Sequence, residues 1–272
     1  MRQPLEVHTM PRVVALYRYP LKGFTPEHCT TLAVLPEGRV AGDRVLALRF
    51  ANAPVADDRW CRKYEGVVLA NTPGLARLST QFDHHRLRLK IALGDRILAD
   101  EGLDDAGRKR LVAALTDYVL GLQEHPLRNH PDRLPLKLVG DGVTPRYQDN
   151  AAGQVTLHSR ETIASAAAAL RDPRLSEQRF RSNIAIEGIE AWAEQGWIGR
   201  GIRIGSVEFD VVKPKVRCLA THANPATGER DLPVMQGLMK AFAQKEPTLG
   251  VGMLTRGTGG EIRVGDPVEL LS

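Results

Sequence analysis

Leu87-Arg88-Leu89-Lys90-Ile91-Ala92-Leu93, followed by Gly94-Asp95 and Arg96-Ile97-Leu98-Ala99, is the stretch that shows most clearly how this chain folds. Apolar and charged residues alternate up to Leu93, which is the pattern of a strand with one buried face. Gly94-Asp95 is a turn pair, and a second apolar run follows it directly. The stretch therefore predicts a β-hairpin.

Similar short apolar runs, closed by Gly or Pro, occur along the whole chain, and helical patterns are few. Strands are expected at residues 13–19, 31–35, 40–50, 155–158, 180–186, 201–205, 207–212 and 218–222, and a hairpin is expected at residues 262–271. Helices are expected at residues 105–122, 161–170 and 233–243. This order predicts a mainly β fold with helices (α+β), built as a β-barrel decorated with helices and not as a parallel doubly wound sheet.

Pro, Asn, Asp and Arg are concentrated in residues 125–135, as in a linker. We therefore expect two domains, residues 11–125 and 126–272, with the smaller β domain first. The length of 272 residues is enough for two modest hydrophobic cores.

Composition excludes several classes of protein. No apolar run is long enough to span a bilayer, and residues 1–8 lack the apolar region of a secretory signal. The net charge of +5 comes without a concentrated Lys/Arg run with aromatics, so nucleic-acid binding is not expected. Only three cysteines are present, Cys29, Cys61 and Cys218, which suits a reducing, cytoplasmic location. Phosphate-loop, dinucleotide and HExxH zinc motifs are absent.

Cys218 stands in the segment with the clearest chemical character. Lys213, Lys215 and Arg217 precede it, and His222 follows it. Positive charge near a thiol favours the thiolate, which is either a nucleophile or a soft metal ligand. Free cysteines are also often buried structural residues, so the residues alone leave three interpretations open.

A second chemical segment covers residues 177–186. If it is a strand, Arg179, Arg181 and Asn183 share one face and could bind a phosphate or another oxyanion. The alternative is a solvated polar face of a barrel strand.

Three shorter features are weaker when taken singly. Lys22 precedes Gly23 after a strand end, where a cation and backbone N–H groups could hold an anion. Arg44 follows Gly42-Asp43 in a turn. Ser159 begins a helix, where it is either a cap or part of a phosphate site.

Taken together, these segments resemble the MOSC domain, the domain of the molybdenum cofactor sulfurase C-terminus. The residues that carry the resemblance are Arg179-Phe180-Arg181-x-Asn183-Ile184, Trp197-Ile198-Gly199, Ile204-Gly205, Arg217-Cys218-x-x-Thr221, Asn224-Pro225-x-Thr227-Gly228 and Ile262-Arg263-Val264-Gly265-Asp266. The N-terminal part, with Tyr19-Pro20-Leu21-Lys22-Gly23 and Gly42-Asp43-Arg44, resembles the β-barrel-like domain that precedes MOSC. This is the arrangement of the mitochondrial amidoxime-reducing component and its bacterial relatives.

The resemblance implies a molybdenum cofactor, in which molybdenum is held by molybdopterin, a phosphate-bearing pterin dithiolene. Cys218 then matches the cysteine that gives a thiolate to molybdenum. The residues implied to hold the phosphate and pterin are Lys22, Arg44, Arg181 and Asn183, with Arg217 as a further candidate and Arg179 and Ser159 as weaker ones. Gly23 departs from the serine of many relatives, which would pass one phosphate contact to the backbone.

The implied activity is the reduction of N-hydroxylated or related N-oxygenated small molecules. Some bacterial relatives carry a C-terminal [2Fe–2S] domain, and this sequence shows no such cysteine cluster, so a separate iron–sulfur or flavin protein is expected to supply electrons. The alternative is a cofactor carrier or sulfur-relay module that uses a Cys218 persulfide. The family is also sometimes associated with pyridoxal phosphate, which needs a Schiff-base lysine, and no lysine stands out for that role.

Overall fold

The structure, a computed structural model, describes residues 10–271. Residues 1–8, in which no secretory signal is expected, lie outside the described residues. The strands are β1 (Arg12–Arg18), β2 (Glu27–Cys29), β3 (Thr31–Val34), β4 (Ala47–Arg49), β5 (Leu78–Asp83), β6 (Arg88–Leu93), β7 (Arg96–Gly102), β8 (Lys137–Val139), β9 (Val155–Ser159), β10 (Ile184–Glu187), β11 (Gly201–Ile204), β12 (Val207–Val216), β13 (Thr248–Arg256), β14 (Gly260–Arg263) and β15 (Val268–Leu270). The α-helices are α1 (Asp105–Leu120), α2 (Arg160–Leu170) and α3 (Val234–Ala241).

Within the described residues this is the mixed α+β architecture, mostly sheet, that the sequence predicts. The β6–β7 hairpin is confirmed, with Gly94-Asp95 as its turn. The predicted helices are confirmed as α1, α2 and α3, with their ends shifted by at most two residues. No helix of residues 10–271 is both long and apolar enough to cross a bilayer.

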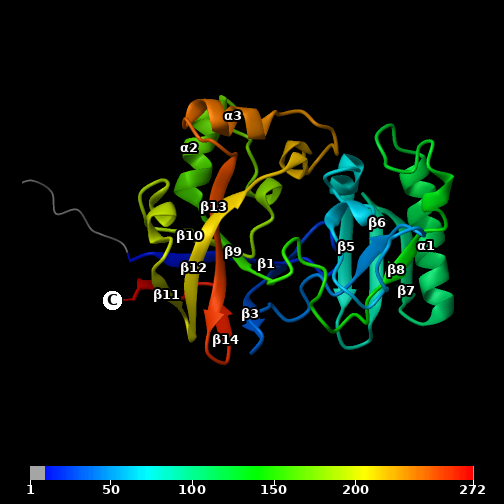
Figure 1. Cartoon of the computed structure of the whole chain (residues 1–272), viewed down its shortest axis with the longest axis horizontal. Coiled ribbons are helices and arrows are strands. Elements are labelled where there is room, and N and C mark those ends of the chain that lie inside the picture. Colours follow the sequence, from blue (N-terminus) through cyan, green and yellow to red (C-terminus); the bar gives the residue numbers. More distant parts are fainter. Residues whose placement is uncertain (1–9, 272) are drawn as a thin grey trace, which may run out of the picture.

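The larger body contains an eight-stranded sheet in the order β15-β11-β12-β13-β9-β10-β1-β2 (Figure 1). All its neighbours pair antiparallel except β9 and β10, which are parallel. Its inner face is apolar, with Leu16, Leu157, Phe209 and Val251 almost completely buried. Helices α2 and α3 pack together at one end of this sheet.

The strand ladders do not close into a barrel in the described residues, so the expected β-barrel is corrected to an open sheet. One isolated bridge, between Arg12 of β1 and Pro267, brings the two sides of the sheet together. Val268 N donates to Pro11 O at 2.8 Å beside it. On its other side Val13 N donates to Asp266 O at 2.9 Å, and Gly265 N donates to Val13 O at 2.8 Å. Backbone hydrogen bonds therefore join β1 to the segment just before β15, although the pairing is limited to this one bridge and forms no strand ladder.

The smaller body holds the antiparallel sheet β5-β6-β7 against α1, and the short pair β4-β8 (Figure 1). Leu89, Leu111 and Leu115 are fully buried in its separate apolar core. The barrel-like domain expected here is therefore also corrected, to a three-stranded sheet plus a two-stranded ribbon. Alternation in sequence marks strands but does not show whether their edges meet.

The domain boundary at residue 125 stays a prediction. Two strand pairings run across it, because β1 pairs with β10 and β4 pairs with β8. The first strand of the chain therefore lies inside the sheet built mainly from its second half.

Near the chemical segments, the strand predicted at 180–186 is confirmed only for its second half, and the strand predicted at 218–222 is wrong. The hairpin predicted at 262–271 is also wrong, because β14 pairs with β3 and β15 pairs with β11. Residues 177–180 form a 3₁₀ turn capped by Ser176, and β10 begins only at Ile184. Residues 219–222 also form a 3₁₀ turn, since the Thr221 hydroxyl and backbone N–H both bond back to Cys218 O. In both places local hydrogen bonds from Ser or Thr compete successfully with strand pairing.

Candidate functional site

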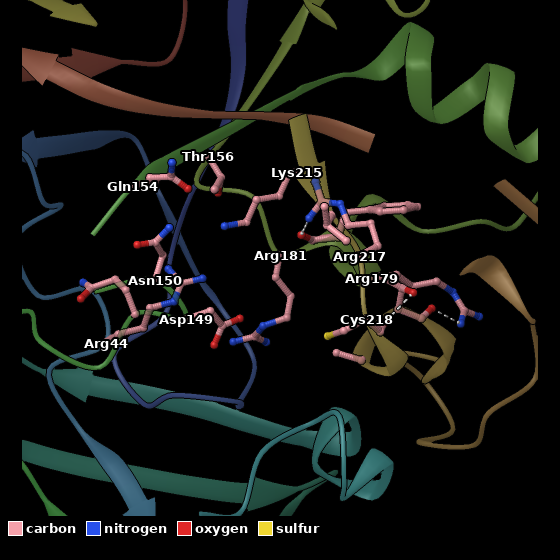
Figure 2. A pocket seen from close by; sticks show the side chains of 15 residues that line it. Arg44, Asp149, Asn150, Gln154, Thr156, Arg179, Arg181, Lys215, Arg217 and Cys218 are labelled. Atoms are coloured by element: carbon pink, nitrogen blue, oxygen red, sulfur yellow. Dashed lines mark hydrogen bonds between the residues drawn. The ribbon is translucent and has the colours of Figure 1, made fainter. Parts of the chain in front are cut away.

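Cys218 lies just beyond the C-terminal end of β12, between the last strand residues and the 3₁₀ turn. Its side chain is partly exposed and lines two adjoining pockets between the bodies. In Figure 2 its sulfur points into the space that also receives Arg44 and Arg181. The thiol is thus part of a cavity wall and is not a buried structural residue.

Arg44 and Arg181 come from different halves of the chain and meet on one aromatic ring. Their guanidinium carbons lie 4.7 and 4.3 Å from the centre of the buried Tyr19 ring. Both residues adopt the left-handed backbone conformation, with a φ of 52° each. That conformation is unfavourable for a residue with a Cβ and is typical of positions that the surrounding structure holds for a purpose.

Lys22 is the third predicted cation in this space. It is buried, and its Nζ lies 3.5 Å from the carbonyl oxygens of Cys61 and Gln148. Burial lowers the pKa of Lys22, while the Asp149 carboxylate, 3.7 Å away, opposes that effect. An anion bound next to Lys22 would stabilise its charged form in the same way.

Arg217 and Arg179 line the pocket but use their guanidiniums on the protein itself. Arg217 donates to Leu249 O at 2.8 Å and to Phe180 O at 2.7 Å, and burial lowers its pKa to about 10. Arg179 donates to His222 O at 3.0 Å and to Asp231 at 2.6 Å. In Figure 2 the Arg179 guanidinium points away from the cavity. Both residues hold the segments around Cys218 in place.

Asn183 lies one layer behind the pocket. Its carbonyl oxygen accepts from the Thr156 hydroxyl at 3.1 Å, and its amide nitrogen lies 3.4 Å from Asp43 Oδ1. Asp43 in turn forms an ion pair with Arg44. Asn183 therefore positions groups that reach the cavity.

Ser159 is not brought to the pocket. It is completely buried and caps α2, where its hydroxyl accepts from Thr162 N at 3.0 Å. It also lies 3.5 Å from the buried Glu194 carboxylate. A capping function explains every contact that it makes.

Two cations in the site were not among the residues chosen from the sequence. Lys63, from the 3₁₀ turn Lys63–Glu65, lines the same pocket as Cys218. Burial would lower the pKa of Lys63, but the sulfur and Asp149 outweigh it and raise that pKa. Lys215 extends from β12 into the same space, where burial and Arg217 lower its pKa to about 8. Its place in the basic run before Cys218 was the only signal in the sequence.

Asp149 is the third residue that sequence reasoning missed. It lines both pockets from the connection between β8 and β9, and no motif marks it. Partial desolvation by the cavity walls would raise the pKa of its carboxyl, but Lys22, Arg44, Lys63 and Lys215 hold that pKa below its usual range. The cavity thus combines one thiol, several cations from both halves of the chain, and one ionised carboxylate.

Part of this chain is similar to known proteins. Residues 144–269 match the MOSC domain family. Mitochondrial amidoxime-reducing component 1 of Mus musculus is 35% identical over 108 residues, which is 36% of this chain and 31% of that protein. The Homo sapiens protein of the same name is 31% identical over 110 residues, or 37% and 32% of the two chains. The matched segment is therefore about a third of the length of these curated relatives.

Solved structures with a similar arrangement are distant in sequence. The YUAD protein from Bacillus subtilis is 10% identical with a TM-score of 0.45, over 96% of each chain. YiiM from Geobacillus stearothermophilus is 16% identical with a TM-score of 0.33, over 43% of this chain and 54% of that one. The family match covers β9 to β15 and includes Cys218 and Asp149, so residues 144–269 of this chain are a MOSC domain.

Proposed function

We propose that this chain is a molybdenum-cofactor-binding oxidoreductase that reduces N-hydroxylated or other N-oxygenated small molecules. The observation that carries the proposal is the cavity in which a single thiol, Cys218, faces cations from both halves of the chain. The name of the curated relatives, which refers to amidoxime reduction, supports this class of reaction.

The side chains of the cavity fit a metal whose other ligands come from a bound cofactor. In residues 10–271 no group of three or more His, Cys, Asp or Glu side chains could hold a metal ion by itself. A pterin dithiolene brings two sulfur ligands and a phosphate, and so needs one protein thiolate and several cations. Gln148 and Gln154 also line the pocket with buried side-chain oxygens that have no partner among the described residues. Such oxygens can accept from the N–H groups of a pterin ring.

On this proposal Cys218 would bind the metal, and Lys22, Arg44, Arg181 and Lys215 would bind the anionic parts of the cofactor. Lys63 would add a further cation beside the sulfur. Arg179 and Arg217 would hold the backbone on both sides of the sulfur. Bound in this way, the cofactor supplies two-electron redox chemistry, and the protein supplies position and charge.

The reaction would consume two electrons and two protons, break one N–O bond and release the oxygen as water; an N-hydroxylated substrate gains an N–H bond, and an N-oxide gains none. A separate iron–sulfur or flavin protein would supply the electrons. The three cysteines are free in the structure, which is compatible with the proposed cytoplasmic location.

Metal analysis of protein purified from a host that makes the cofactor tests this proposal. We expect about one molybdenum per chain in the wild type and almost none in Cys218→Ala, since that variant lacks the thiolate. Cys29→Ala is the matched control, because Cys29 is a free thiol that does not line the pocket. A wild type without stoichiometric molybdenum, or unchanged molybdenum in Cys218→Ala, would contradict the proposal.

The alternative is a cofactor carrier or sulfur-relay module. The same observation supports it, because the Cys218 thiol lines the pockets. Incubation with a cysteine desulfurase, followed by mass spectrometry, separates the two. An adduct of about 32 Da on Cys218 that turns over would favour sulfur relay. Substrate-dependent oxidation of an added electron donor would favour the oxidoreductase.

A further inference from the structure

Asp149 is the carboxylate that lies in the middle of the cationic cavity. Its Oδ1 lies 3.7 Å from Lys22 Nζ. Figure 2 shows its carboxylate between the side chains of Arg44 and Arg181, and Lys215 extends from β12 into the same pocket. An acidic side chain is thus present where the proposed function requires an anion to bind.

The backbone on the N-terminal side of Asp149 is firmly anchored. Tyr147 N donates to Arg44 O at 3.0 Å, and the Tyr147 side chain is completely buried. Gln148 is 95% buried, and its carbonyl oxygen accepts from Trp60 Nε1 at 2.8 Å. The fold therefore fixes the backbone position of Asp149, because hydrogen bonds to Arg44 and Trp60 hold the two residues before it.

The charge of Asp149 has a direct consequence for ligands. The Asp149 side chain is 58% exposed to solvent, and its carboxylate neutralises part of the field that its cationic neighbours produce. A small free anion would have to displace this carboxylate or bind beside it against charge repulsion. A ligand that is also held through a metal–thiolate bond has additional binding energy with which to do so.

We propose that Asp149 is a specificity-determining residue: its carboxylate is the resident counter-ion of the cavity and excludes small inorganic anions such as phosphate and sulfate. The pocket then stays available for a ligand that binds through other groups in addition to its anionic group. This inference rests on the proposed function for the nature of that ligand.

Binding of inorganic phosphate to the ligand-free full chain, measured by calorimetry at pH 7 and low salt, tests it. We expect Asp149→Asn to bind phosphate about tenfold more tightly than the wild type, because one like charge within several ångströms is removed. Asp149→Ser is a second variant that should shift the affinity in the same direction. Asp95→Asn is the matched control, since Asp95 lies in the β6–β7 turn and does not line the pocket. Circular dichroism checks that each variant is folded.

Adding Lys22→Met to the Asp149→Asn variant should abolish the increase in phosphate affinity. The inference is overturned if both Asp149 variants bind phosphate no better than the wild type. It is equally overturned if the gain survives Lys22→Met, because the phosphate would then bind elsewhere. Molybdenum content tests the proposed function separately. If Asp149→Asn binds phosphate more tightly but the wild type contains no molybdenum, Asp149 keeps its role as counter-ion and the proposal of a molybdenum cofactor fails.

Discussion

At the scale of single residues, the site depends on side chains and backbones that are held in unfavourable conformations. Arg44 and Arg181 are left-handed, and Gly23, next to Lys22, has a φ of +86°. A Cβ on Gly23 would lie 2.7 Å from Val68 Cα, which is closer than real Cβ contacts. A serine at this position would therefore need a different path of the neighbouring segment.

Gly23→Ala should destabilise the protein by about 3 kcal/mol, of which roughly 1–2 kcal/mol is backbone strain and the rest is steric overlap with Val68. Gly94→Ala is the matched control, because Gly94 has a φ of +57° but nothing within 4 Å of its Cβ position. Gly94→Ala should lower the free energy of unfolding only by the backbone strain, roughly 1–2 kcal/mol. Urea unfolding midpoints measure both, and equal losses in the two variants would show that the overlap with Val68 is relieved without cost.

At the scale of elements, a buried polar cluster joins β1 and β9 to the 3₁₀ turn Glu177–Phe180. The Glu177 carboxylate accepts from the Tyr17 hydroxyl at 2.5 Å, lies 3.3 Å from His158 Nε2 and pairs with Arg160. Burial alone would raise the pKa of Glu177, but hydrogen bonds from His158, Arg160 and Tyr17 lower it to about 2. The cluster fixes the turn that leads to Arg179 and Arg181.

A carboxyl with a lowered pKa stabilises the fold above its unfolded-state pKa, and this contribution is lost as the pH falls toward the folded-state value. For Glu177 this window runs from about pH 4.5 down to about pH 2. The stability difference between wild type and Glu177→Gln should therefore shrink by about 2 kcal/mol between pH 6 and pH 3. Urea unfolding at the two pH values measures it, with the exposed Glu190→Gln as control. A difference that does not change with pH would contradict the role of the charge.

At the scale of the whole molecule, the cavity exists only where the two bodies meet. Lys22, Arg44 and Lys63 come from the N-terminal half, while Arg181, Lys215 and Cys218 belong to the MOSC domain. The eight-stranded sheet needs the first strand as well, because β1 pairs with β10. Folding of the MOSC sheet and assembly of the site are therefore coupled to the N-terminal half.

Residues 126–272 expressed alone should accordingly lack a cooperative thermal transition, since β10 would have an unpaired edge and apolar core residues such as Ile184 and Ile186 would lose contacts with β1. Co-expression with residues 1–125 should restore the transition. Calorimetry and near-ultraviolet circular dichroism measure this. A cooperative transition of residues 126–272 alone would show that β1 is dispensable.

Local patterns in the sequence were sufficient for the hairpin at Gly94-Asp95, the helices α1 to α3 and the cap at Ser159. The basic run pointed to Cys218, and the family resemblance pointed to the cations Lys22, Arg44 and Arg181; the structure brings these residues to two adjoining pockets. These features are readable because alternation, capping and the chemical type of a side chain depend on a residue and its near neighbours.

Only the tertiary structure decided the rest. The open form of the sheet, the insertion of β1 beside β10, and the presence of Lys63 and Asp149 beside Cys218 depend on contacts between distant parts of the chain. A local pattern carries no information on which edges pair or which loops meet, since that is set by the path of the whole backbone. The sequence by itself therefore determined the thiol of Cys218 and the cations Lys22, Arg44 and Arg181. The tertiary structure added the Asp149 carboxylate, which is their counter-ion.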